Sequence, residues 1–249
     1  MLKSEIQLNA EAVKFREKKG HSNKEPLNIF SLLLSEKNYT LIKTKLSSNI
    51  SGMCIRDDET YFIALNSAMS LGRQRFTLAH ELYHLEIEGL NEGCICGSSL
   101  YDAKSVQEKE ADIFASFLLM PYDGLEWYIE SNQIKKWTVY EVIRLSVFFG
   151  ISYLATICRL EREGRIDKKQ ASELKEYNVC GEAVKYGLDP KLYYSTDEEF
   201  QVMGDYPRRL EICNEKGFMK QGLYNQYIRE GNLDDKKYPE MERGVILND

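Results

Sequence analysis

The spacing of apolar residues divides the early part of the chain into strands followed by a helix. Three short segments are rich in Tyr, Thr, Ile and Phe, as β-strands are: residues 39–46, 49–56 and 60–66. An acidic break at residues 57–59 separates the last two segments and is typical of a hairpin turn. The pattern therefore predicts a small antiparallel sheet near the start of the chain.

Helical spacing of apolar residues begins at Ser70 and continues to about Glu88, where Gly89 is placed to end the helix. A second helix is predicted over residues 105–120 and is stopped by Pro121. Further helices are predicted on both sides of this region: residues 5–19, a short helix opening at Pro26, and residues 138–149, 153–163, 204–216 and 219–229.

These elements predict an α+β protein with a mostly helical C-terminal part. The sheet and the first long helices are assigned to a domain of residues 1–130. Residues 131–175 contain a helix-turn-helix-like pair across Gly150, and residues 176–249 form a C-terminal helical region. The three-part division follows Gly, Pro and polar content between the predicted helices.

The composition is that of a globular chain, with 43% hydrophobic and 29% charged residues among 249. A net charge of -6 argues against a general nucleic-acid binder, which needs an excess of Lys and Arg. No apolar run approaches the roughly 20 residues that cross a bilayer, and no signal-peptide core follows Met1. A cytoplasmic location is therefore expected, where the six cysteines are free thiols.

The most informative segment is His80-Glu81-Leu82-Tyr83-His84, an H-E-x-x-H pattern within a predicted helix. Two histidines four positions apart share one helix face, so both imidazoles can bind one tetrahedral zinc ion. Glu81 is offset around the helix, where a carboxylate can take a proton from the attacking water and pass it to the leaving amine. The pattern predicts a zinc-dependent hydrolase; the alternative is a pair of solvated or core histidines.

A catalytic zinc ion needs a third protein ligand, and the second predicted helix offers three carboxylates. Glu110 shares its face with apolar residues three, four and seven positions later. An unpaired charge on a buried face is costly, so Glu110 is expected to meet a cation and is the first choice as ligand. A surface position or an arginine partner is the other interpretation. Glu108 is the second choice, and Asp112 is a candidate hydrogen-bond acceptor from a ligand histidine.

Two blocks of sequence resemble the ImmA/IrrE family of metallo-endopeptidases. The block from Arg73 to His84 is similar to the family's R-x-R-F-T-x-A-H-E-x-G-H helix, and the block from Glu108 to Pro121 to its E-x-E-A-N/D-x-F-A-x-x-L-L-M-P helix. The likeness covers roughly residues 10–130. It implies a zincin-like sheet packed on an active-site helix, followed by a helix-turn-helix-like region. It also implies a Zn²⁺ ion held by His80, His84 and Glu110, with Glu81 as the general base.

The resemblance further implies a substrate. Members of the family are implicated in cleaving helix-turn-helix transcriptional repressors of mobile-element, prophage and stress-response circuits, so a protein of this kind is the expected partner. In zincin-like enzymes the strand beside the active-site helix holds an extended peptide, which assigns that task to residues 61–66; a plain core or edge strand is the alternative. Tyr83 stands where the family commonly has glycine, so the packing beside the helix is expected to differ.

Other functions remain open: a non-catalytic protein-binding partner or a DNA-binding regulator in a toxin-antitoxin or repressor complex. The second helix of the pair across Gly150 offers three arginines, Arg159, Arg162 and Arg165, balanced by Glu161 and Glu163, so direct DNA binding is not favoured. Cys94-x-Cys96 follows His84 by ten residues. A thiolate there can occupy the water position of the metal, or both cysteines are unreactive free thiols.

Overall fold

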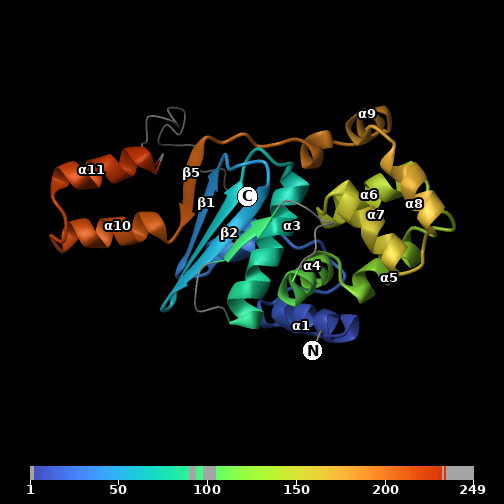
Figure 1. Ribbon diagram of the computed structural model, residues 1–249, viewed down its shortest axis with the longest axis horizontal. Coiled ribbons are helices and arrows are strands. Elements are labelled where there is room, and N and C mark those ends of the chain that lie inside the picture. Colours follow the sequence, from blue (N-terminus) through green and yellow to red (C-terminus); the bar gives the residue numbers. More distant parts are fainter. Residues whose placement is uncertain (1–2, 90–93, 98–104, 232, 234–249) are drawn as a thin grey trace, which may run out of the picture.

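A five-stranded sheet lies at the centre of the protein, and helices cover it (Figure 1). The computed structural model describes residues 3–89, 94–97, 105–231 and 233. In spatial order β4-β2-β3-β1-β5, the strands are β4 (Cys94–Gly97), β2 (Ile50–Asp57), β3 (Thr60–Asn66), β1 (Tyr39–Thr44) and β5 (Phe200–Gly204). The predicted α+β class is confirmed.

The sheet is mixed, which corrects the expectation of a purely antiparallel one. β2 and β3 form the predicted antiparallel hairpin, with Asp57 opposite Thr60 and Asp58 at a positive φ of 51° in the turn. β1, however, runs parallel to β3, with Tyr39 opposite Tyr61. The reason is topological: residues 45–49 turn the chain back, so β2 runs opposite to β1, and β3, which reverses again and lies between them, runs in the same direction as β1.

Helices from the first half of the chain pack against the sheet and each other. They are α1 (Glu5–Lys18), α2 (Ile29–Ser35), α3 (Leu71–Leu82), its continuation η1 (Tyr83–Glu88), α4 (Val106–Leu119) and α5 (Tyr122–Ser131). Polar side chains fix the starts of α1 and α4, since Ser4 forms a capping box with Gln7 and Ser105 accepts from the Glu108 amide. α2 begins at Ile29, capped by Asn28, rather than at Pro26.

Helix α4 forms the middle of the core. Phe114 and Phe117 are fully buried on it, and Phe114 meets Phe15 of α1 edge to face with ring centroids 6.4 Å apart. α4 also packs along α3, as α1 does along α4 (Figure 1). The helix that carries the H-E-x-x-H pattern therefore lies between the sheet and α4, both of which can contribute side chains to it.

The later part of the chain is mostly helical. It contains α6 (Val139–Phe149), α7 (Tyr153–Arg162), α8 (Lys168–Lys175), α9 (Val179–Lys185), the 3-10 turn η2 (Pro190–Tyr193), α10 (Tyr206–Glu215) and α11 (Gln221–Glu230). Helices α5 to α9 gather at one end of the molecule, and α10 and α11 lie beside β5 at the other (Figure 1). The division at residues 130 and 175 stays a prediction, although β5 joins the sheet by pairing with β1.

One arginine of the first family-like block ties the active-site helix to this helical part. Arg75 of α3 donates to the carbonyl of Gly150, at 2.7 Å, in the turn between α6 and α7. Gly150 has a φ of 64°, and a Cβ there would lie 2.6 Å from the Arg75 side chain. Within the described ranges no single helix is long and apolar enough to cross a bilayer; α6 and α7 pass that test only as a pair bent by 107°.

Candidate metal centre

The histidines of the H-E-x-x-H pattern lie where a helix changes its hydrogen bonding. α3 begins after Ser70, whose side chain accepts from the backbone of Arg73, and it continues into the π-helical turn η1. Gly89 adopts a left-handed conformation with a φ of 73° and ends the helix where the sequence predicts. Turns of π-helix inserted in α-helices are frequent at functional sites.

Three candidate ligand side chains from two successive helical segments and α4 converge at this point. The Nε2 atoms of His80 and His84 are 3.2 Å apart, and the residues are only 5% and 1% exposed. From α4, Glu108 places one carboxylate oxygen 3.3 Å from Nε2 of His80 and the other 3.2 Å from Nε2 of His84. The structure thus brings together both predicted histidines and the second-choice carboxylate.

Each histidine is also held from behind by a carboxylate. Nδ1 of His80 lies 2.9 Å from Asp112, as predicted, and Nδ1 of His84 lies 2.7 Å from Glu88. Such contacts orient the ring and fix the proton on Nδ1, which leaves the Nε2 lone pair for a metal ion. Sequence reasoning missed Glu88, although its position four residues after His84 on a helix is a signal that could have found it.

The chemistry of these donors fits a zinc ion. Two Nε2 atoms and a carboxylate at 3.2 to 3.3 Å are held together by a shared cation, which is either a proton or a metal ion. Ligands at 2.0 to 2.1 Å from a tetrahedral zinc ion are about 3.3 Å apart, which matches these separations. His80, His84 and Glu108 therefore have the atoms and the spacing to hold the ion.

The electrostatics point the same way. Burial lowers the pKa of His80, but hydrogen bonds to Asp112 and Glu108 outweigh it and raise that pKa to about 10. Hydrogen bonds with His80 and His84 hold the pKa of the Glu108 carboxyl well below its usual range. A site that retains a proton so strongly attracts cations, and a metal ion would have to displace that proton.

Glu81 lies beside the three ligand atoms and is completely buried. Its Oε2 accepts a weak hydrogen bond from the thiol of Cys96 at 3.4 Å, and its Oε1 has no hydrogen-bond partner among the described residues. Burial raises the pKa of the Glu81 carboxyl, against the opposing effect of His80. A buried carboxyl of this kind both accepts and releases a proton nearer to neutral pH than an exposed one.

Glu110 does not lie with the histidines, which corrects the first choice of third ligand. It is buried, as its apolar face predicts, but its carboxylate accepts hydrogen bonds from the Tyr83 hydroxyl and, at 2.6 Å, from the backbone nitrogen of Lys3. Residues two positions apart on an α-helix point about 200° apart around its axis. Glu108 and Glu110 cannot both face the histidines, and the structure turns Glu108 towards them.

Tyr83 compensates the buried charge of Glu110. The tyrosine is 2% exposed, its ring packs 5.5 Å from that of Phe114, and its hydroxyl donates to Glu110. The tyrosine therefore has room beside the active-site helix, and a difference in packing from glycine-containing relatives stays a prediction. The extra side chain fills space between α3 and α4 on the side away from Glu108.

The peptide-binding role predicted for residues 61–66 does not fit the sheet. These residues form β3, which is paired on both sides, with β2 and with β1. A strand with both edges occupied has no free backbone groups to pair with a substrate. The described strand at the edge beside β2 is β4, which pairs antiparallel with β2.

Cys96 of β4 also reaches the histidines. It is 2% exposed, and its sulfur belongs with His80, His84 and Glu108 to a group of ligand atoms that all lie within 4.8 Å of one another. The interpretation that places a thiol over the metal thus fits Cys96, and the side chain of Cys94 lies outside the described residues.

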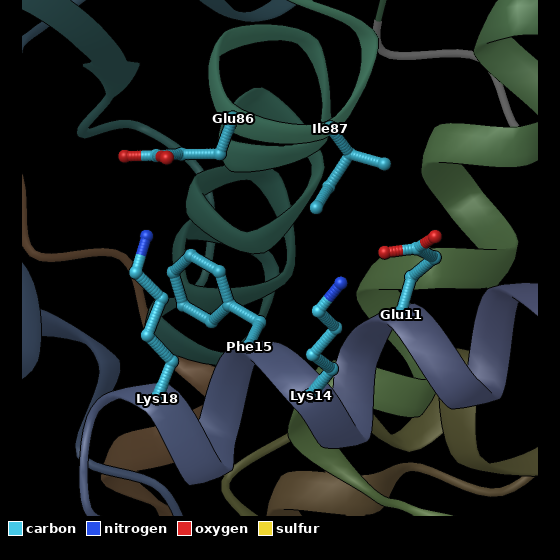
Figure 2. A pocket seen from close by; sticks show the side chains of 6 residues that line it. All are labelled: Glu11, Lys14, Phe15, Lys18, Glu86 and Ile87. Carbon is cyan, nitrogen blue, oxygen red and sulfur yellow. The ribbon is translucent and has the colours of Figure 1, made fainter.

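A separate hollow lies between α1 and η1 and has a volume of about 180 Å³ (Figure 2). Its lining is mixed in charge: Glu11, Lys14, Phe15, Lys18, Glu86 and Ile87. None of the converging ligand atoms belongs to these residues. The hollow carries no nucleophile or metal-binding set, so it does not compete with the metal centre as the functional site.

A family profile matches the part of the chain that holds the metal centre. The sequence profile of Peptidase_M78, described as the IrrE N-terminal-like domain, matches residues 35–161, just over half of the chain. A search of curated proteins gave no match. A solved structure, a Mycobacterium tuberculosis transcriptional regulator, is similar at 15% identity and a TM-score of 0.44, over 62% of this chain and 46% of that one.

The matched range contains β1, β2 and β3, both histidines, Glu81, Glu108 and most of the helix pair α6–α7. It thus covers every converging residue described above and both sequence blocks that resemble ImmA/IrrE. The chain belongs to the Peptidase_M78 family and has a metallopeptidase-like fold.

Proposed function

We propose that this protein is a zinc-dependent endopeptidase. The observation that carries the proposal is the convergence of His80 Nε2, His84 Nε2 and the Glu108 carboxylate at 3.2 to 3.3 Å, with both Nδ1 atoms anchored. When bound there, zinc would lower the pKa of water towards about 7 and polarise a peptide carbonyl. The family assignment supports the same chemistry.

Glu81 is the general base in this proposal. It follows His80 directly on α3, and its buried carboxyl has a raised pKa. It takes a proton from the attacking water and delivers it to the nitrogen of the leaving amine, two steps that require one group to serve as base and then as acid. Asp112 and Glu88 orient the two histidines while this proton moves.

The proposed substrate is a helix-turn-helix transcriptional repressor of a mobile-element, prophage or stress-response circuit. This part rests on the family resemblance of the two sequence blocks. A repressor encoded beside the gene of this protein is the first protein to examine.

Direct DNA binding is less well supported. Arg159 of α7 is turned inwards, since it is 1% exposed and donates to Ser116 at 2.9 Å. The more exposed Arg162 reaches the same hydroxyl at 3.3 Å and pairs with Glu5 of α1. Arg159 also forms an ion pair with Glu163. Contacts with phosphates require accessible guanidinium groups, so α7 contributes to packing against α4 instead.

The test is cleavage of that repressor by the zinc-loaded protein. Glu81→Gln is expected to lower the cleavage rate by about 10² to 10⁴, the usual contribution of a general base, while zinc content is unchanged. A chelator abolishes cleavage, and the exposed Glu211→Gln on α10 serves as a control that cleaves normally. Cleavage that survives Glu81→Gln would contradict the assigned mechanism.

A further inference from the structure

The pairing of β4 with β2 directs Cys96 towards the active-site helix. Cys96 lies opposite Gly52 in this antiparallel pair, and residues opposite each other point to the same face of a sheet. At Gly52 that face is towards α3, because a Cβ there would lie 2.6 Å from the side chain of Thr77 and 3.0 Å from that of Glu81. Glycine in β2 thus makes the room in which Glu81 and Cys96 meet.

The position of the sulfur matches that of a fourth ligand. Cys96 Sγ is 3.8 Å from Oε1 of Glu108 and 3.4 Å from Oε2 of Glu81. In a tetrahedral zinc site with a sulfur ligand at about 2.3 Å and an oxygen ligand at about 2.1 Å, the two ligand atoms are about 3.6 Å apart. The four candidate ligand atoms, all within 4.8 Å of one another, therefore enclose one ion-sized space.

We infer that Cys96 is the fourth protein ligand of the metal ion and holds the enzyme in a closed, latent form. The inference rests on the proposed function, because it concerns the same ion. A catalytic zinc site keeps one position for water, whereas a site with four protein ligands has none. With Cys96 bound, His80, His84, Glu108 and the thiolate fill the tetrahedron.

Binding of Cys96 to the ion also involves Glu81, the proposed general base. A thiol that binds zinc loses its proton, and Glu81 Oε2 accepts from the Cys96 thiol at 3.4 Å. The proton passes to Glu81 and then to solvent, so no redox partner is needed. Activity requires that Cys96 leave the ion, which frees both the water position and the carboxylate of Glu81.

The closing contact depends on a short element. β4 is four residues long, and its pairing with β2 contains a register shift between Ile50 and Gly52. β4 is also the edge neighbour of β2, the place where an extended peptide would add to the sheet. A substrate strand that pairs with β2 would therefore displace Cys96 as it binds.

Replacement of zinc by Co²⁺ tests the ligand directly, because a thiolate bound to Co²⁺ gives a charge-transfer band in the near ultraviolet. The native protein is expected to bind one Co²⁺ with that band and with visible bands of a tetrahedral site. Cys96→Ala is expected to lose the near-ultraviolet band and to keep the ion. Cys213→Ala on α10 is the matched control and keeps both features.

Activity supplies the second measurement. With zinc bound, Cys96→Ala is expected to cleave the repressor with a kcat/KM raised about tenfold or more, since the closed form no longer competes. An unchanged or lower kcat/KM in this variant would overturn latency. If the variant does not fold, alkylation of the native protein decides: zinc should protect Cys96 from iodoacetamide, and His80→Ala should remove the protection.

The two proposals fail in different ways. A native Co²⁺ complex with tetrahedral visible bands and no charge-transfer band overturns the role of Cys96 and leaves the metal site intact. A native protein that binds no Co²⁺ overturns the metal site and with it the proposed peptidase. If the native Co²⁺ complex shows the charge-transfer band but neither Cys96→Ala nor the native protein cleaves the repressor, Cys96 is a metal ligand and the proposed peptidase function is wrong.

Discussion

The two sides of helix α4 carry carboxylates with opposite tasks. On one side Glu108 and Asp112, four residues apart, meet the nitrogens of His80 and His84. On the other side Glu110 meets a tyrosine hydroxyl and a backbone amide. All three carboxylates lie within five consecutive residues, so the side of the helix, and not the distance along the chain, decides which of them can bind a cation.

The comparison shows what burial does and does not reveal. Glu110 is buried, whereas Glu108 is half-buried. A buried charge needs a partner, but the partner can be a hydrogen-bond donor as well as a metal ion. The more accessible glutamate is the one at the candidate metal centre, where a substrate must also be able to reach.

Removal of each glutamate in turn gives the largest expected effect. Glu108→Ala is expected to weaken zinc binding by more than about 100-fold, beyond the loss usual for a residue that only orients a ligand. Glu110→Ala is expected to leave zinc affinity within a few-fold of the native value and to lower stability instead. Calorimetric titration of both variants with zinc checks the pair, and equal losses would break the distinction between the two sides.

Asp112→Asn is the next largest change. Its oxygen lies 2.9 Å from Nδ1 of His80, so the asparagine keeps the shape but loses the charge that fixes the ring. A loss of about 10- to 100-fold in zinc affinity is expected. Competition with a chromophoric chelator measures the zinc affinity, with Glu211→Gln as the control. An Asp112→Asn variant with native zinc affinity would show that Asp112 does not support the metal site.

Zinc affinity is also expected to depend on pH. Because the pKa of His80 is raised to about 10, the imidazole is charged at lower pH and zinc must displace its proton. Affinity should therefore rise about tenfold per pH unit for each proton displaced and level off above about pH 10. Titrations across this range give the slope, and an affinity independent of pH below 10 would show that no such proton is displaced.

The smallest effect belongs to the other side of α4. Tyr83→Phe removes the hydroxyl that donates to Glu110 and should lower the free energy of unfolding by about 1 kcal/mol, the net value of a buried hydrogen bond. Chemical denaturation of the metal-free protein measures it, alongside zinc titration. A large loss of zinc affinity in Tyr83→Phe would contradict the separation of the Glu110 side of α4 from the metal-binding side.

Much of this arrangement was predictable from short-range patterns. The H-E-x-x-H spacing, the Asp112 contact and the helix end at Gly89 all depend on helical periodicity, and the structure has the expected geometry at each. The choice between Glu108 and Glu110 was not, because the apolar stripe identifies the buried side of α4 but not the element that it meets. Tyr83 supplied the partner from another helix.

Contacts between distant parts of the chain account for the other differences. β5 pairs with β1 although more than 150 residues separate them, and its sequence, Phe200–Gly204, is too short to be distinguished from a loop by periodicity. The parallel pairing of β1 with β3 follows from the order of strands in space. Helices α5, α8 and α9 were not predicted either, since short amphipathic stretches give weak patterns.

The most direct test of the metal centre is the position of the ion. Crystals of the zinc-loaded protein, measured above and below the zinc absorption edge, locate it by anomalous scattering. One peak is expected about 2.0 to 2.1 Å from Nε2 of His80, Nε2 of His84 and a carboxylate oxygen of Glu108. A peak bound to Glu110, or full zinc loading with no peak between the two histidines, would contradict the proposed metal centre.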